Sequence, residues 1–179
     1  SPKEALRLLI EDVHIRNFAW NKLYKKHLFD AIQFPLLRYL EDLAIMYALF
    51  DKAQRVVSIN LPYYIYVRHT ASLTAMLSPL KKYHSFCAYS MRHPYVMKHF
   101  PELVHYHTSL VWRSAMYAAN SFVVNAAHFN EYKNEYTELV ALLRNYALDI
   151  AKSKHVSRKN NAYCRAIVRG KWVHTLVVR

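Results

Sequence analysis

Glycine is nearly absent from this 179-residue sequence, in which Gly170 is the single example. A dinucleotide-binding turn needs three glycines within a short span, and a phosphate-binding loop needs two. Tight β-hairpins also depend on glycine, because their turns require positive φ angles. The sequence therefore excludes these nucleotide-binding loops and predicts a mostly helical chain with few tight turns.

Cysteine is scarce as well. Cys87 and Cys164 are too few for a disulfide framework or a four-cysteine zinc site, so we expect both to have packing roles in a reducing compartment. His105 and His107 lie two residues apart in a predicted helix, so they face different directions and cannot share a metal ion. No metal site is predicted within this chain.

Acidic residues are also few. Twelve Asp and Glu stand against 25 Lys and Arg, which gives a net charge of +13. No acid occurs from Lys52 to Pro101, and none follows Asp149. Such an excess predicts an anionic partner, which would be nucleic acid, a phosphorylated substrate or an anionic lipid. The alternative is a basic face that is simply solvated.

The remaining composition predicts a folded chain, because 54% of the residues are hydrophobic and 15% are aromatic. A change of pattern near residues 74–79 indicates a boundary. Before it, we expect a helix opened by Ser1-Pro2, a helix from Glu41, and strands at Arg55–Ile59 and Tyr63–Val67. After it, we expect helices at Pro79–Arg92, Pro101–Phe129, Glu131–Lys152 and about Ala162–Arg169.

Two groups of side chains before this boundary are candidates for chemistry. Glu41 and Asp42 open a helix, where the free N–H groups stabilise an anion. An ionised carboxylate there can accept a proton from a hydroxyl, although acids are also common in first turns for structural reasons. Tyr64, Tyr66 and Arg68 share one face of the second predicted strand. In one interpretation, Arg68 holds a phosphate or carboxylate. In the other, the tyrosines belong to the core and Arg68 pairs with an acid such as Glu41.

The third candidate group is Trp20 and Lys22. An exposed tryptophan next to a lysine suits stacking on a sugar or contact with a phosphate. A buried tryptophan covered by the aliphatic part of the lysine is the alternative.

Four segments, taken in order, carry a resemblance to a known family. They are Trp20–Tyr24 (WNKLY), Phe34-Pro35, Glu41-Asp42 and Tyr64–Ser72 (YIYVRHTAS). This order resembles the second half of bacterial family 2 glycosyltransferases with the GT-A fold, in the group that builds capsular, exopolysaccharide and lipopolysaccharide chains. The resemblance covers roughly residues 4–75.

The resemblance implies an α/β fold, the C-terminal portion of a GT-A nucleotide-diphospho-sugar transferase with few strands. Residues 1–75 would be the acceptor-side part of the catalytic domain, and residues 76–179 a mainly helical region with a basic tail. The implied activity is inverting transfer of a sugar from a nucleotide-sugar donor to an acceptor hydroxyl. Asp42 would be the general base and Glu41 its neighbour. Arg68 would lie on the leaving-group side, and Trp20, Lys22 and Tyr66 would bind substrate.

The sequence also departs from the family pattern. No D-x-D motif occurs, and Leu36 and Leu37 stand where family members tend to have a glycine. We therefore interpret the chain as the C-terminal part of a longer enzyme, inactive alone, whose other part would hold the nucleotide-sugar and a divalent metal, Mg²⁺ or Mn²⁺. The acceptor would be a saccharide or a lipid-linked saccharide. We expect a cytoplasmic location, with the basic tail against anionic lipid at the inner face of the cell membrane, and no nucleic acid.

Two other hypotheses belong to different classes of protein. The first is a basic helical module that binds nucleic acid or an anionic membrane surface without catalysis. The second is a helical interaction module whose apolar Leu110–Val124 stretch packs against a second copy of the chain, which would make a homo-oligomer.

Overall fold

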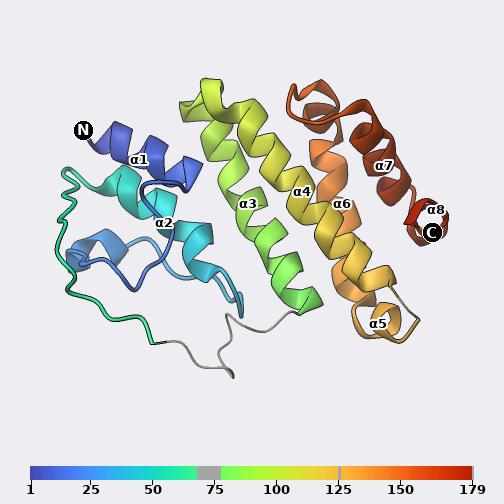
Figure 1. The fold of residues 1–179 in the computed structure, drawn as a ribbon, viewed down its shortest axis with the longest axis horizontal. Coiled ribbons are helices and arrows are strands. Elements are labelled where there is room, and N and C mark those ends of the chain that lie inside the picture. Colours follow the sequence, from blue (N-terminus) through green and yellow to red (C-terminus); the bar gives the residue numbers. More distant parts are fainter. Residues whose placement is uncertain (68–77, 125, 179) are drawn as a thin grey trace. The chain divides into compact units, whose positions relative to one another are not determined.

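The computed structural model describes residues 1–67, 78–124 and 126–178. The chain divides into two compact units, Ser1–Leu77 and Ser78–Arg179. The predicted boundary after residue 75 falls within 68–77, outside the described residues. Each unit has its own helices (Figure 1).

The first unit contains α1 (Pro2–Glu11), the short 3-10 helix η1 (Lys26–Phe29) and α2 (Glu41–Lys52). The Ser1 hydroxyl accepts a hydrogen bond from the Glu4 N–H at 3.3 Å, which makes Ser1 the N-cap that the sequence predicts. Helices α1 and α2 contact each other. Their most deeply buried side chains are Leu9, Ile10, Met46 and Leu49.

The predicted α/β fold is wrong for the described residues, which are helical and contain no β-strand. The segments predicted as strands, Arg55–Ile59 and Tyr63–Val67, run without regular structure after α2 (Figure 1). Their β-branched and aromatic residues favour extended backbone, but a strand also needs a neighbour to take its hydrogen bonds. No neighbouring strand exists among the described residues, so these residues do not form the predicted part of a GT-A sheet.

The second unit is a bundle of helices. Its main elements are α3 (Pro79–His99), α4 (Val104–Val123) and α6 (Lys133–Lys152), with the short helices η2 (Pro101–Leu103) and α5 (Ala126–Glu131) between them. Helices α7 (Arg158–Val168) and α8 (Lys171–Val178) follow, joined at Gly170, whose φ of 108° suits glycine alone. In Figure 1 α4 lies between α3 and α6, and α7 lies beyond α6.

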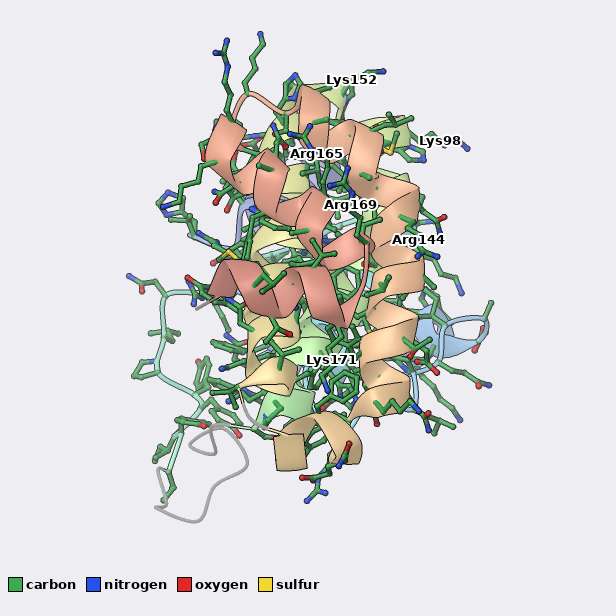
Figure 2. All side chains as sticks on the ribbon, turned by 90° about the vertical axis from the view of Figure 1, so that its right-hand side faces the viewer. Lys98, Arg144, Lys152, Arg165, Arg169 and Lys171 are labelled. Atoms are coloured by element: carbon green, nitrogen blue, oxygen red, sulfur yellow. The ribbon has the colours of Figure 1, made fainter. Side chains whose placement is uncertain are left out.

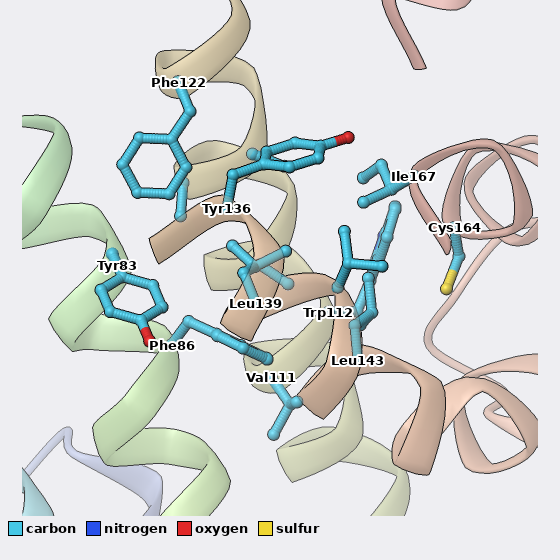
Figure 3. Packing of buried hydrophobic residues seen from close by; sticks show 14 of the residues in the cluster. Tyr83, Phe86, Val111, Trp112, Phe122, Tyr136, Leu139, Leu143, Cys164 and Ile167 are labelled. Carbon is cyan, nitrogen blue, oxygen red and sulfur yellow. The ribbon is translucent and has the colours of Figure 1, made fainter. Parts of the chain in front are cut away.

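The core of the second unit is formed by α3, α4, α6 and α7 (Figure 3). Helix α4 supplies much of it, because Val111, Ala115, Ala118, Ala119 and Phe122 are fully buried. The small alanine side chains let the neighbouring helices approach closely. Much of the apolar stretch Leu110–Val124 is therefore buried inside the unit, while Tyr117 and Val124 remain exposed.

Helix α3 continues beyond its predicted end at Arg92 and passes through Pro94. A proline in a helix cannot donate the hydrogen bond that the carbonyl four residues earlier would accept. That carbonyl belongs to Ser90, and it accepts a hydrogen bond from the Tyr146 hydroxyl at 3.1 Å instead. Tyr146 lies on α6, so a tertiary contact replaces the missing helical bond.

Buried histidines connect α3, α4 and α6. The Arg92 Nε donates to His107 Nε2 at 3.0 Å, so the proton of a neutral His107 is on Nδ1. His107 Nδ1 lies 3.0 Å from His93 Nδ1, which must then accept and leave the His93 proton on Nε2. His93 Nε2 faces the Asp149 carboxylate at 3.9 Å. Burial, and then the Arg92 charge, hold the pKa of His107 well below its usual value.

Candidate functional site

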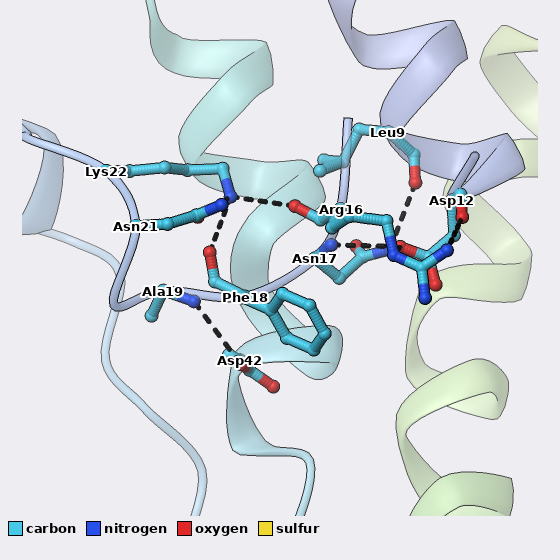
Figure 4. A network of polar contacts seen from close by, with 9 residues as sticks. All are labelled: Leu9, Asp12, Arg16, Asn17, Phe18, Ala19, Asn21, Lys22 and Asp42. Atoms are coloured by element: carbon cyan, nitrogen blue, oxygen red, sulfur yellow. Dashed lines mark hydrogen bonds and ion pairs between the residues drawn. The ribbon is translucent and has the colours of Figure 1, made fainter. Parts of the chain in front are cut away.

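The candidate site lies in the first unit, on the loop that leaves α1. Asp12 ends that helix in left-handed backbone with a φ of 54°. Its Oδ1 accepts hydrogen bonds from the Asn17 backbone N–H at 2.9 Å and from Asn17 Nδ2 at 2.8 Å. Asn17 Nδ2 also donates to the Leu9 carbonyl at 3.0 Å (Figure 4). Asn17 is buried, so these contacts fix the loop against the end of α1.

The side chain of Lys22 also stabilises this loop. Its ammonium donates to the carbonyl of Arg16 at 2.7 Å, to the carbonyl of Phe18 at 2.5 Å and to Asn21 Oδ1 at 2.7 Å. An ammonium has three hydrogens to donate, and these contacts use all of them. Burial lowers the pKa of Lys22, and the carboxylates of Asp42 and Asp12 act against that shift. Lys22 therefore stabilises the loop. It contributes positive charge to the site, but its hydrogens are not free to bind a ligand.

Asp42 lies in the first turn of α2, next to Glu41, which is the first residue of the helix. Asp42 Oδ2 accepts a hydrogen bond from the Ala19 N–H at 3.3 Å (Figure 4). Asp42 Oδ1 accepts a second hydrogen bond from the Leu43 N–H at 2.8 Å. Leu40, just before the helix, adopts left-handed backbone with a φ of 60°. The carboxylate of Asp42 is thus held against the loop at the residue that precedes Trp20.

Four aromatic rings gather at Trp20. The Trp20 ring centroid lies 5.0 Å from Phe18, 4.7 Å from Tyr64 and 4.9 Å from Tyr66, and no pair is tilted by more than 31°. We call Phe18, Trp20, Tyr64 and Tyr66 the Trp20 stack. Between 39 and 51% of each residue's surface stays exposed, so the stack has ring surface left for a ligand. The Arg16 guanidinium lies over Phe18, 5.7 Å from its centroid.

A cleft of about 880 Å³ opens beside the Trp20 stack. Trp20, Tyr24, Tyr63 and Tyr64 supply rings to its lining, and Arg16, Lys22 and Arg55 supply positive charge. Tyr24 is fixed by hydrogen bonds from its hydroxyl to the Ala19 carbonyl and to Met46 Sδ, both at 3.2 Å. Burial raises the pKa of Tyr24 to about 12. Asp42 and Tyr66 do not line this cleft.

The structure thus brings together some of the residues singled out in the sequence. Trp20 and Tyr66 are in contact, and Asp42 lies against the residue before Trp20. Lys22 is turned into its own loop, and Arg68 lies outside the described residues. Sequence reasoning missed several further residues, which are Arg16, Asn17, Tyr24 and Arg55. Only the Asp12 to Asn17 spacing carried a signal, since both residue types favour helix ends and turns.

The described residues contain no cluster of metal-binding side chains and no helix suited to cross a bilayer. No three His, Cys, Asp or Glu side chains converge as a metal site would require in that part of the chain. No helix there combines the length and the apolar character needed to cross a bilayer.

No known protein family, curated protein or solved structure matches the chain.

Proposed function

We propose that this chain is the acceptor-side part of an inverting glycosyltransferase, which moves a sugar from a nucleotide-sugar to an acceptor hydroxyl in cell-surface polysaccharide synthesis. One observation carries the proposal. Asp42 is hydrogen-bonded to Ala19, and the next residue, Trp20, stacks on Tyr64 and Tyr66. Three segments that are far apart in the sequence thereby meet, and the residue that hydrogen-bonds to the carboxylate is the neighbour of an exposed aromatic ring.

This combination suits the handling of a sugar acceptor. Aromatic rings offer flat apolar surfaces on which the C–H face of a sugar ring can lie, and the Trp20 stack has such surface exposed. A carboxylate beside a bound sugar can accept the proton of the attacking hydroxyl as the new bond forms. Asp42 has this role in the proposal, and Glu41 is its neighbour on α2.

The charges of the cleft agree with a phosphorylated partner. Arg16 and Arg55 line it with guanidinium groups, whose planar donors match phosphate oxygens. The ammonium of Lys22, which is hydrogen-bonded within the loop, adds to this positive charge. The nucleotide-sugar and a Mg²⁺ or Mn²⁺ ion would be bound chiefly by residues outside this chain. The proposal depends on this site and not on a GT-A sheet, which the described residues do not form.

The test replaces Asp42 by asparagine in the complete gene product and measures sugar transfer from a panel of nucleotide-sugars to saccharide and lipid-linked acceptors. Asparagine keeps one oxygen to accept a hydrogen bond but cannot take up a proton. We expect the Asp42→Asn variant to lose activity by a factor on the order of 10² to 10⁴, which is the usual contribution of a general base. Its circular dichroism spectrum should match that of the wild type.

The matched control is Glu41→Gln, which makes the same chemical change one residue earlier on α2. This control should keep most of the activity. Near-normal turnover by Asp42→Asn would show that Asp42 is not the base. A wild-type protein that transfers no sugar from any donor in the panel would contradict the proposed activity itself.

A further inference from the structure

Helix α6 carries exposed cations beside α7. Two of its acids are engaged with α3: Glu138 accepts a hydrogen bond from the Tyr83 hydroxyl at 2.6 Å, and Asp149 faces His93. Arg144 and Lys152 are both exposed, and Lys152 lies three residues after Asp149. The Arg144 guanidinium donates to the Val168 carbonyl at 3.2 Å, so Arg144 adjoins the end of α7.

Helix α7 continues the positive charge. Arg158, Arg165 and Arg169 are seven and four residues apart, so they lie on one side of α7, and all three are exposed. No acidic residue occurs on α7 or α8. Figure 2 looks onto the side of the second unit formed by α6, α7 and α8, where Arg144, Lys152, Arg165 and Arg169 are labelled. Lys171, also labelled, places its ammonium 3.5 Å from the centre of the Phe129 ring.

An exposed leucine lies among these cations. Leu148 is four residues from both Arg144 and Lys152, so it lies between them on α6. It is 73% exposed. We define the α6–α7 basic face by Arg144, Leu148, Lys152, Arg158, Arg165 and Arg169.

We propose that the α6–α7 basic face docks on an anionic membrane surface. This inference is independent of the proposed sugar transfer. A leaflet with anionic headgroups offers phosphate oxygens to the arginines and lysine, and the apolar region beneath them accepts Leu148. The backbone of a nucleic acid offers the phosphates but no apolar layer, and the six residues of the face include no aromatic side chain to stack on bases. The leucine therefore favours a lipid surface.

The test measures sedimentation of the full chain with vesicles of phosphatidylcholine alone and of phosphatidylcholine with one quarter phosphatidylglycerol. We expect binding to the anionic vesicles only. Each exposed cation near such a surface strengthens binding about fivefold, so Arg165→Gln/Arg169→Gln should weaken it about 25-fold. Leu148→Gln keeps the net charge and should weaken vesicle binding, while leaving any binding to an oligonucleotide duplex unchanged.

The matched control is Lys82→Gln/Arg113→Gln, which removes two exposed charges on α3 and α4 and should keep vesicle binding close to that of the wild type. Circular dichroism melting confirms that each variant is folded. If the control variant lost as much vesicle binding as Arg165→Gln/Arg169→Gln, net charge alone would account for binding and no defined face would be involved. Tighter binding to the duplex than to anionic vesicles would assign the face to nucleic acid, and absence of vesicle binding would overturn the proposal directly.

Discussion

Lys22 shows how far the role of a side chain depends on where its hydrogens point. Next to Trp20 in sequence, it suggests a contact with substrate phosphate. In the structure its three hydrogens are directed at Arg16, Phe18 and Asn21 of the same loop. A charged donor with three internal acceptors stabilises the loop more than it serves a ligand.

Replacing Lys22 by methionine should therefore destabilise the protein. Methionine keeps most of the aliphatic part but leaves the carbonyls of Arg16 and Phe18 without their charged donor. Hydrogen bonds to a charged group contribute about 2 kcal/mol, and we expect a loss of that size in the free energy of unfolding. Urea denaturation measures the loss, and amide hydrogen exchange should locate it in residues 12–24.

The control for this prediction is Lys25→Met. Lys25 lies on the same loop and its side chain is exposed, so its replacement should change the free energy of unfolding little. Equal losses in the two variants would mean that Lys22 acts only through general charge.

At the scale of elements, Pro94 is the clearest case of a local rule overruled by a tertiary contact. Because of Pro94, the Ser90 carbonyl has no hydrogen-bond donor within its own helix. It accepts a hydrogen bond from the Tyr146 hydroxyl on α6 instead. We expect Tyr146→Phe to lower the free energy of unfolding by about 1–3 kcal/mol, the cost of leaving a buried polar group unsatisfied. The phenylalanine ring retains the edge contact with His93.

A double-mutant cycle isolates this contact. In a Pro94→Ala background the Ser90 carbonyl regains an N–H donor from its own helix, so Tyr146→Phe should cost less there. Tyr117→Phe on α4, where the side chain is exposed, is the control for loss of a hydroxyl. An unchanged cost of Tyr146→Phe in the Pro94→Ala background would contradict the role assigned to Tyr146.

The helices were predictable from the sequence where local signals mark them. Ser1-Pro2, Glu41 and Pro79 carry the start signals of α1, α2 and α3, and the three helices begin there. The end of α3 was missed because Tyr146 is distant in sequence from Pro94. The strands were predicted wrongly because residue type alone says nothing about a neighbouring strand. The single helix predicted over Pro101–Phe129 is instead divided among η2, α4, which ends at Val123, and α5, and α8 was missed altogether.

The candidate site was predictable residue by residue but not as an arrangement. Asp42, Trp20 and Tyr66 stood out by type and position, yet their grouping depends on contacts across more than twenty residues. Tyr24 ends the WNKLY segment and the Asp12 to Asn17 spacing is typical of a turn, but neither pattern indicates that Asn17 and Tyr24 hold the loop. Their roles follow from burial and from the direction of their polar atoms, which no spacing rule supplies.

At the scale of the whole molecule, the second unit contains a set of buried histidines on different helices. Burial lowers the pKa of His84 and His93 on α3 and of His107 on α4. It lowers the pKa of His174 on α8 to about 4. His174 is enclosed by hydrogen-bonding contacts with the Tyr136 and Tyr163 hydroxyls and with Asn120.

These shifts predict a loss of stability in mild acid. The folded pKa of each histidine is below its unfolded value of about 6.5, so protons bind more tightly to the unfolded chain. The stabilisation is complete above that pH and declines as the pH falls toward the folded pKa. For His174 alone the decline reaches about 2 kcal/mol at pH 5. Thermal unfolding followed by circular dichroism between pH 7.5 and pH 5 should show a falling melting temperature.

Replacing His174 tests how much of this dependence of stability on pH is due to that one residue. His174→Gln should lower stability at pH 7.5 and flatten its dependence on pH, whereas His155→Gln, at an exposed position in the loop before α7, should leave that dependence unchanged. A melting temperature that stays constant from pH 7.5 to pH 5 would contradict the assignment of neutral buried histidines.

Leu40 gives the start of α2 a property that its position in the sequence does not reveal. A residue with a Cβ atom in left-handed backbone is strained by on the order of 1 kcal/mol, whereas glycine adopts both hands freely. A glycine here would let the turn, and with it the first residues of α2, sample several directions. Leucine in this conformation persists only where the surrounding structure over-determines it. The direction of the Asp42 carboxylate is therefore preorganised: the free energy that orients it is supplied when the chain folds, before any ligand arrives.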